Sequence, residues 1–155
     1  MSSTGYLTGY LDKEAYGKKP GGRKFSSGSY NHLGVYGDTK LMQVLTAREF
    51  SKRFSRKDVS FNSVCPGFVA TGFQEKMGDH IFARIVRFIQ MFYARTPPQG
   101  ASRPIQVLTD PKYSQLNGVF VDAYLPLPSI LAYQVTDENS KWIYEKSNEL
   151  VGLKS

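Results

Sequence analysis

A tyrosine and a lysine stand four residues apart in the stretch YGDTKLMQVLTAREF, as Tyr36 and Lys40. On an α-helix, residues at this spacing lie on one face, so the lysine ammonium can approach the phenol. A cation held beside a phenol favours the ionised phenolate. Such a tyrosine can give a proton to a carbonyl oxygen or take one from an alcohol. Taken alone, the pair is weak evidence for proton transfer, because this spacing is common on solvated helix faces.

A second pattern follows in NSVCPGFVAT, where a run typical of a strand stops at Pro66 and Gly67, and Thr71 comes four residues after the glycine. A strand that ends in a tight turn is where open α/β sheets bind ligands. Backbone beside a glycine can also approach a flat ring closely. The turn by itself is an ordinary strand-to-loop connection. With YGDTK ahead of it, a ligand site becomes the better interpretation.

Helices and strands must position these two patterns. Apolar periodicity predicts an amphipathic helix over 33–54, which carries Tyr36 and Lys40. The other predicted elements are a strand at 58–64, helices at 79–95 and 98–109, a strand at 118–125, and a closing helix from Thr136 or Asp137 to Gly152. Thr96 is the expected N-cap of the helix at 98–109. Pro104 argues against that helix, because proline disfavours a helix interior.

The segment 4–32 is rich in glycine and basic residues and lacks periodicity, which predicts a long loop. Loops of that length inside a compact domain are usually lids or binding loops, or else disordered. The order of the remaining elements predicts an α/β fold whose crossovers are long enough for parallel strands. Two or three strands make a poor parallel sheet, because such a sheet needs both faces and both edges covered. The chain therefore looks like half of a domain.

Composition narrows the class of protein. The 155 residues carry a net charge of +7, with a pI near 9.5, which favours phosphate-bearing ligands, anionic lipid or nucleic acid. Cys65 is the only cysteine, so neither an internal disulfide nor a cysteine-based zinc site can form, and no metal site is expected. We expect an intracellular, reducing compartment. The opening MSSTGYLTGY has neither a basic region nor an apolar run of secretory type, and no segment has eighteen uninterrupted apolar residues, so we expect that this form does not span a membrane.

Together, the two patterns resemble the short-chain dehydrogenase/reductase family. Its Tyr-x-x-x-Lys helix precedes a strand with Asn-x-x-x-Pro-Gly-x-x-x-Thr, read here as Asn62, Pro66, Gly67 and Thr71. The opening MSS resembles the end of the strand that carries the family's serine, with Ser3 a better candidate than Ser2. The resemblance implies one partial domain over 1–155, with a Rossmann-type parallel sheet and flanking helices. The first strands of that sheet are missing, and with them the glycine-rich turn that binds the dinucleotide.

The family's site implies a role for each matched residue. Tyr36 would be the proton donor or acceptor, Lys40 would assist it and bind the nicotinamide ribose, and Ser3 would orient the substrate oxygen. The cofactor would be NADP or NAD, lined by Pro66 and Gly67, with Val69 backbone near the carboxamide and Thr71 toward the amide or phosphate. The hydride comes from the nicotinamide, so the protein supplies placement and proton handling.

Two branches of the family are the most similar. LTAREFSKRF and SNELVGL resemble the protochlorophyllide reductase branch, and RTPPQGA resembles the retinol dehydrogenase branch. A bulky apolar substrate, protochlorophyllide-like or retinoid-like, is therefore expected. The segment 78–95 falls where the family has its substrate lid, although a plain core helix is an equal alternative. The basic edge of 79–95 also suits contact with an anionic membrane surface. A plastid is one of the locations that the resemblance allows.

Two hypotheses compete with an active enzyme. The chain could be the C-terminal half of a truncated reductase that binds NADPH poorly by itself, or a catalytically inactive binding protein that kept the lid and the basic loop. Lys18, Lys19, Arg23 and Lys24 form a basic patch in that loop. No nucleic-acid-binding fold signature accompanies the patch, so no nucleic-acid partner is expected.

Overall fold

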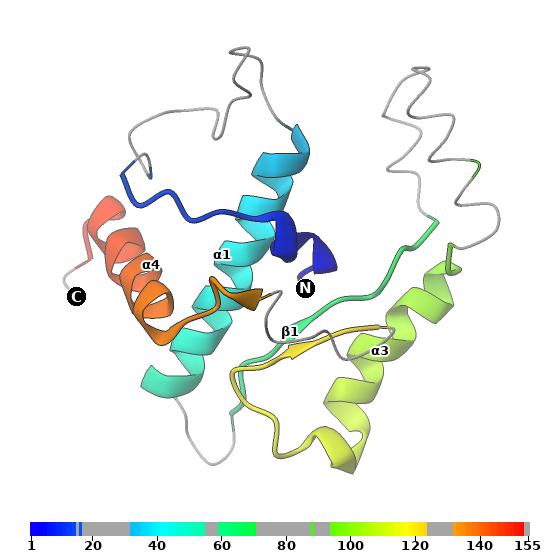
Figure 1. Ribbon diagram of the computed structural model, residues 1–155. Helices are drawn as coiled ribbons and strands as arrows, with labels where there is room; N and C mark the ends of the chain where they lie inside the picture. The colour runs from blue at the N-terminus through cyan, green and yellow to red at the C-terminus, as the bar shows by residue number, and fades with distance from the viewer. Residues whose placement is uncertain are drawn as a thin grey trace.

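The computed structural model describes residues 1–14, 16, 32–54, 59–70, 88, 94–123 and 132–153. The elements in chain order are the 3-10 helix η1 (Thr4–Thr8), helix α1 (His32–Arg53), strand β1 (Ser63–Val64), helix α3 (Pro97–Thr109), the 3-10 turn η3 (Pro111–Tyr113), strand β2 (Phe120–Val121) and helix α4 (Asp137–Leu150). Figure 1 shows α1 beside α4, with α3 across the strands from them.

The two strands of the described chain pair in parallel. Ser63 lies opposite Phe120, and Val64 lies opposite Val121. The parallel α/β arrangement that the element order predicted is confirmed at this coarse level. Among the described residues of 58–64 and 118–125, regular pairing covers two residues of each strand, which is shorter than the sequence predicted; residues 58, 124 and 125 lie outside the described residues.

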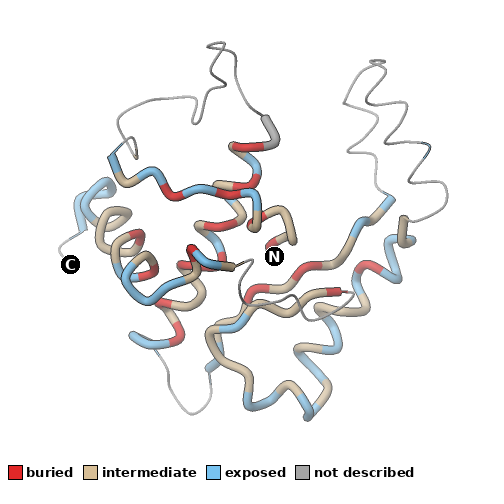
Figure 2. The backbone as a smooth tube through the Cα atoms, viewed as in Figure 1, coloured by how far each residue is buried: buried red, intermediate tan, exposed pale blue. Residues whose placement is uncertain are grey.

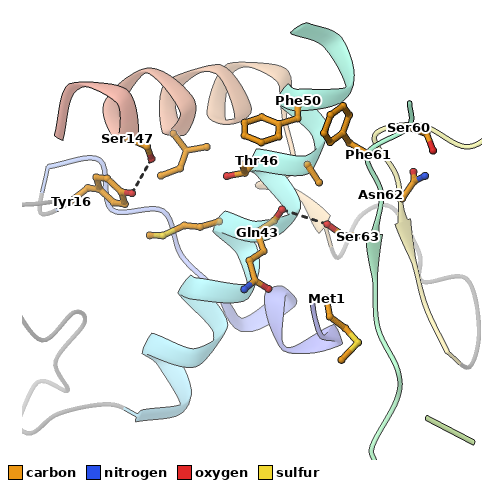
Figure 3. A pocket seen from close by; sticks show the side chains of 13 residues that line it. Met1, Tyr16, Gln43, Thr46, Phe50, Ser60, Phe61, Asn62, Ser63 and Ser147 are labelled. Atoms are coloured by element: carbon orange, nitrogen blue, oxygen red, sulfur yellow. Dashed lines mark hydrogen bonds between the residues drawn. The ribbon is translucent and has the colours of Figure 1, made fainter. Parts of the chain in front are cut away.

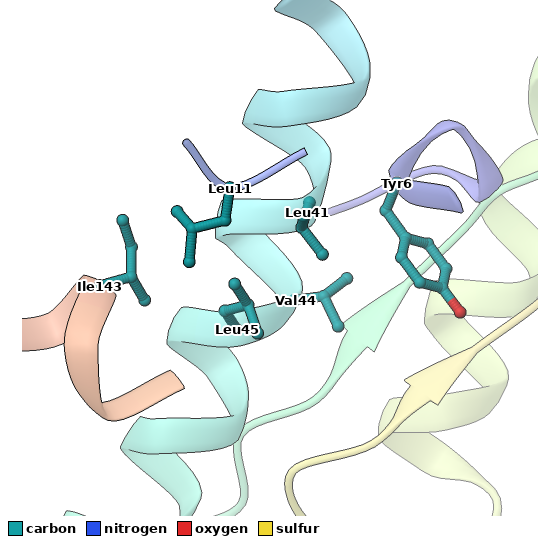
Figure 4. Close-up of a cluster of buried hydrophobic side chains, with 6 residues drawn as sticks. All are labelled: Tyr6, Leu11, Leu41, Val44, Leu45 and Ile143. Carbon is teal, nitrogen blue, oxygen red and sulfur yellow. The ribbon is translucent and has the colours of Figure 1, made fainter. Parts of the chain in front are cut away.

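Helix α1 is the centre of the hydrophobic core. Its Leu41, Val44 and Leu45 side chains are almost completely buried, as expected for positions on one helical face. They pack with Ile143 of α4 and with residues of the N-terminal segment, which gives the cluster Tyr6, Leu11, Leu41, Val44, Leu45 and Ile143 drawn in Figure 4. Figure 2 shows buried positions on α1 and on the segments packed against it. The core therefore fixes the N-terminal segment onto the helix that carries Tyr36.

Local capping explains where helix α3 begins. The Thr96 side chain accepts a hydrogen bond from Gln99 N, and the Gln99 side chain accepts one from Thr96 N, so each satisfies a free amide of the other. The predicted Thr96 cap is confirmed. The helix continues through Pro104 to Thr109, although an interior proline costs a helix about 3 kcal/mol.

Two sequence predictions need correction. The segment 4–32 is not loop throughout, because Thr4–Thr8 forms η1, with Ser3 Oγ accepting a hydrogen bond from Gly5 N at its start. The helix predicted over 79–95 does not extend to its last residue, because Arg95 is paired with Val69 in an isolated parallel bridge. Residues 79–87 and 89–93 lie outside the described residues, as does most of the predicted lid at 78–95.

Candidate functional site

Tyr36 and Lys40 lie on one face of α1, as their spacing predicts. The Lys40 Nζ atom is 5.5 Å from the centroid of the Tyr36 ring, which is within the range of a cation–π contact. Lys40 also donates a hydrogen bond to Gln43 Oε1 at 3.3 Å. The Tyr36 side chain is 44% exposed, so a ligand can reach the ring from solvent. The helix thus holds a cation beside an accessible phenol.

Ser3 lies close to Tyr36 although the two are far apart in sequence. A Cβ atom added to Gly5 would be 2.8 Å from Tyr36 Cε1 and 3.4 Å from Ser3 Oγ, so both side chains border the same glycine. The Ser3 hydroxyl already accepts the Gly5 amide at 3.1 Å. The start of η1 therefore brings Ser3 and Tyr36 to the same glycine.

Ser2 has a different position from Ser3. Its side chain is 4% exposed, and its hydroxyl donates to the backbone carbonyl of Lys40 at 3.1 Å. Its amide donates to Val64 O at 2.8 Å. Ser2 thereby joins α1 to β1, and its hydroxyl is engaged by backbone. Of the two serines, the structure brings Ser3 to the glycine that the Tyr36 ring also borders, and the role of Ser3 stays a prediction.

Beyond β1 the chain makes the turn that the sequence predicted. Gly67 has a φ of 85°, a conformation that favours glycine, and its amide donates to Cys65 Sγ at 3.4 Å. Arg95 holds the turn from the other side, because its Nη1 donates to Pro66 O at 3.4 Å and its amide to Phe68 O at 2.8 Å. Thr71 lies outside the described residues.

Val69 is fixed between Arg95 and helix α3. Ala70 N donates to Arg95 O at 2.9 Å, and this bond and the Arg95 bond to Phe68 O lie on one edge of the strand-like segment. Because peptide groups alternate along an extended chain, the N–H and C=O of Val69 point to the opposite edge. A Cβ atom on Gly100 would come within 2.5 Å of Val69 Cγ2, so Val69 packs directly on α3.

Three glycines and an aspartate belong to the Tyr36 region, although the sequence reading did not select them. A Cβ on Gly37 would meet Gly5 O and Gly9 N, each at 2.9 Å, so the segment 5–9 packs backbone to backbone on α1. Asp38 Oδ1 accepts the Tyr10 amide at 2.7 Å. A glycine inside a predicted helix weakens it, and Gly37 was therefore the available signal of this close approach.

A buried glutamine secures the same segment from the C-terminal side. Gln134 Oε1 accepts from Leu11 N at 2.9 Å, and its Nε2 donates to Gly9 O at 3.1 Å. Nearby, burial and then the Asp122 carboxylate raise the pKa of the Tyr6 phenol, whose ring packs against Phe120 at 4.6 Å. Gln134 thus joins the segment that precedes α4 to the segment that follows η1.

A cavity of about 550 Å³ lies apart from the Tyr36 ring, between α1, α4 and the residues that lead into β1. Figure 3 shows Gln43, Thr46 and Phe50 of α1 on one side of it and 60–63 on the other. Ser63 Oγ bridges the two sides by donating to Gln43 O at 3.4 Å. The described residues contain no group of metal-ligating side chains. None of the described helices is long and apolar enough to cross a membrane.

The described chain thus combines a parallel α/β unit, a tyrosine and a lysine on one helix, and a glycine turn after a strand. The chain is 28% identical over 133 residues to human retinol dehydrogenase 14, covering 83% of this chain and 38% of that protein. It is 28% identical over 135 residues to chloroplastic protochlorophyllide reductase of pea, covering 81% and 33%. A mouse retinol dehydrogenase 14 is 28% identical over 94 residues, covering 60% and 28%.

No family model matches the chain. The chain spans about a third of the length of the curated relatives it matches. These similarities support a relationship to oxidoreductases of the short-chain dehydrogenase/reductase family, in line with the resemblance seen in the motifs, and they carry no further than that relationship.

Proposed function

We propose that these residues form the proton-handling part of an NAD(P)-dependent oxidoreductase of short-chain type. The observation that carries the proposal is the meeting of two side chains of α1 with one from the N-terminal segment. Lys40 lies over the Tyr36 ring, and Ser3 borders the same glycine as that ring. An exposed phenol with a cation on one side and a hydroxyl on another is suited to proton transfer at a carbonyl or alcohol.

Each residue has a role in the proposed reaction. The Tyr36 hydroxyl gives its proton to the substrate oxygen during reduction, or takes one during oxidation. The Lys40 ammonium stabilises the phenolate that forms, because an opposite charge nearby favours the ionised state. Ser3 donates a hydrogen bond to the substrate oxygen and keeps it beside the phenol. These three groups act on oxygen and leave the reacting carbon free.

The residues after β1 fit a nicotinamide group. The positive φ of Gly67 forms the turn, and the N–H and C=O of Val69 point away from Arg95, where we propose that they hydrogen-bond a carboxamide. Lys40, Pro66, Gly67 and Val69 would hold the nicotinamide half, with Thr71 as a further proposed contact. When bound, NADP or NAD supplies the hydride.

The proposed substrate is bulky and apolar. The relatives are named for retinol and for protochlorophyllide, both of which are large, mostly apolar molecules. The segment 78–95 is the proposed lid, and 79–95 the proposed contact with a membrane surface. An intracellular location, with a plastid as one option, stays a prediction alongside them.

A second candidate is a catalytically inactive binding protein. The observation that favours it is the cavity of about 550 Å³ between α1, α4 and 60–63, which lies apart from the Tyr36 ring. A protein of this kind would still bind an apolar ligand but would show no hydride transfer. Replacing Tyr36 would then leave ligand binding unchanged, and neither the original protein nor the variant would show turnover.

The test is a Tyr36→Phe substitution in a full-length oxidoreductase that contains these residues. Loss of the general acid is expected to reduce kcat by about 10²- to 10⁴-fold while cofactor affinity is retained. Oxidation of NADPH followed by absorbance gives the rate. Tyr10→Phe is the matched control, because Tyr10 is 50% exposed and its backbone, not its hydroxyl, contacts Asp38. Near-normal turnover of the Tyr36→Phe enzyme would contradict the proposal.

A further inference from the structure

Asn117 and Gly118 form a tight turn shortly before β2. Gly118 has a φ of 75°, a conformation that favours glycine, and its amide donates to Phe61 O at 2.8 Å. Asparagine is a chemically labile residue, and it deamidates most readily when glycine follows it. The reason is that no side chain shields the glycine nitrogen from the asparagine amide. The turn therefore holds both partners of a possible self-modification.

Hydrogen bonds hold both reacting groups in the folded chain. Asn117 Oδ1 accepts the Phe61 amide at 2.9 Å, and Asn117 Nδ2 donates to Ser51 O of α1 at 3.4 Å. The Gly118 nitrogen, which is the nucleophile in deamidation, keeps its proton in the bond to Phe61 O. Attack requires this nitrogen to lose its proton and the Asn117 side chain to turn back onto it. Both sets of bonds must therefore break first, which costs free energy.

The Asn62 side chain holds the same turn from both ends. Its Nδ2 donates to Leu116 O at 2.8 Å, and its Oδ1 accepts the Val119 amide at 3.2 Å. Leu116 comes directly before Asn117, and Val119 directly after Gly118, so the two bonds bracket the reactive pair. Opening the turn therefore requires release of the Asn62 bonds together with those of Phe61, which makes it a local opening of several contacts at once.

We propose that Asn117 is a self-modification site, which the bonds from Phe61 and Asn62 keep closed in the folded chain. When the turn opens, the Gly118 nitrogen loses its proton to the solvent and attacks Asn117 Cγ. A bond forms between that nitrogen and that carbon, and the side-chain nitrogen takes up a proton and leaves as ammonia. Water then opens the cyclic imide at one of its two carbonyl groups, which gives aspartate or β-linked isoaspartate. Water is the only co-reactant, and the inference does not depend on the proposed function.

The β-linked product does not fit the closed turn. Isoaspartate adds one carbon atom to the main chain, and turn geometry sets the register of the strand that follows. The amides of Gly118 and Val119 can then no longer both keep their partners. Because Val119 O accepts the Ser63 amide at 2.9 Å, the pairing of β1 with β2 continues directly from this turn. Modification therefore loosens the β1–β2 pair, and the chain cannot reverse it.

The test incubates the 155-residue chain at mildly alkaline pH and follows Asn117 by peptide mass spectrometry, with isoaspartate identified by fragmentation. The folded chain is expected to react at Asn117 at least about tenfold more slowly than the same chain in denaturant, because only the open turn reacts. Equal rates would overturn the proposed closure, and an unreactive Asn117 in the denatured chain would overturn the site itself. In the purified isoaspartate form, exchange of the Ser63 amide should be faster, and an unchanged rate would overturn the loosening of the strand pair.

Two variants separate local opening from global unfolding. Asn62→Ala removes both bracketing bonds and is expected to raise the Asn117 rate in the folded chain about fivefold or more. Gly37→Ala is the matched control, because it weakens the packing of the segment 5–9 on α1 and leaves the Asn62 bonds in place. Equal acceleration in the two variants would overturn the role of Asn62.

Hydrogen exchange gives a second readout that does not require Asn62→Ala to fold. In low concentrations of urea, the Asn117 reaction and the exchange of the Gly118 amide are expected to rise in parallel, because the same opening frees both. A Gly118 amide that exchanges faster while the Asn117 rate stays constant would overturn the proposal.

Discussion

Gly37, which follows Tyr36, has no room for a side chain. Gly37→Ala would place a methyl group 2.5 Å from Thr8 Oγ1 and 2.9 Å from Gly5 O and Gly9 N. Two of these three neighbours are backbone and cannot rotate away. The segment that carries Ser3 must then move off α1, which separates Ser3 from Tyr36.

We therefore predict that Gly37→Ala destabilises the chain by about 1–3 kcal/mol, despite the better helix propensity of alanine. Chemical denaturation followed by Trp142 fluorescence measures the change. Adding Thr8→Ala should recover only part of the loss, because the backbone contacts remain. Full recovery in the double variant would show that the side-chain contact alone was responsible.

Tyr6 gives the chain a pH dependence at the alkaline end. Burial, followed by the Asp122 carboxylate, raises the pKa of its phenol above 10.0. A group with a raised folded-state pKa contributes stability that is complete below the unfolded value and is lost as pH rises through the folded one. The thermal midpoint of the native chain should thus fall more steeply above pH 10.0 than that of Tyr6→Phe. Parallel curves for the two proteins would contradict this.

At the scale of elements, the turn after β1 depends on helix α3. Gly100→Ala would drive a methyl group to within 2.5 Å of Val69 Cγ2. We predict a loss of about 1–2 kcal/mol, with most of it recovered in the Gly100→Ala, Val69→Ala double variant, because residues in direct contact couple. A double-mutant cycle in denaturant measures the coupling. Additive effects would mean that the two positions do not meet.

Some elements could be predicted well from the sequence, and others could not. The helix expected at 33–54 is found at His32–Arg53, because its apolar positions repeat at helical spacing over many turns. Helix η1 was missed, because it depends on one Ser3 cap and on packing against α1 rather than on any repeat. The strands were predicted too long, because apolar alternation does not reveal where a neighbouring strand stops.

In the candidate site, too, some contacts could be predicted from the sequence and others could not. The spacing of Tyr36 and Lys40 predicted their contact, since the helix itself imposes it. The approach of Ser3 to Tyr36 was suggested only by resemblance, because contacts between distant segments are made by packing. Arg95 was not selected as a support of the Pro66–Gly67 turn, because no local pattern marks a residue that bonds to backbone some thirty positions away.

At the scale of the whole molecule, the proposed function puts the nicotinamide end of a dinucleotide at the turn after β1, and the described residues contain no glycine-rich strand-to-helix turn for its pyrophosphate. We predict that these 155 residues alone bind NADPH weakly and catalyse no turnover. Titration calorimetry with NADPH measures the affinity, with NADH as the comparison. Tight binding by the isolated chain would contradict the view that it acts as part of a larger oxidoreductase.

The position of Cys65 also provides a built-in chemical reporter. It is the only cysteine in the sequence, its side chain is 2% exposed, and its sulfur accepts the Gly67 amide directly beneath the turn. A thiol reagent can thus label the chain only while that turn is open. The alkylation rate under native conditions, read by mass spectrometry, therefore measures how often the turn at Pro66 and Gly67 opens, without any engineered label.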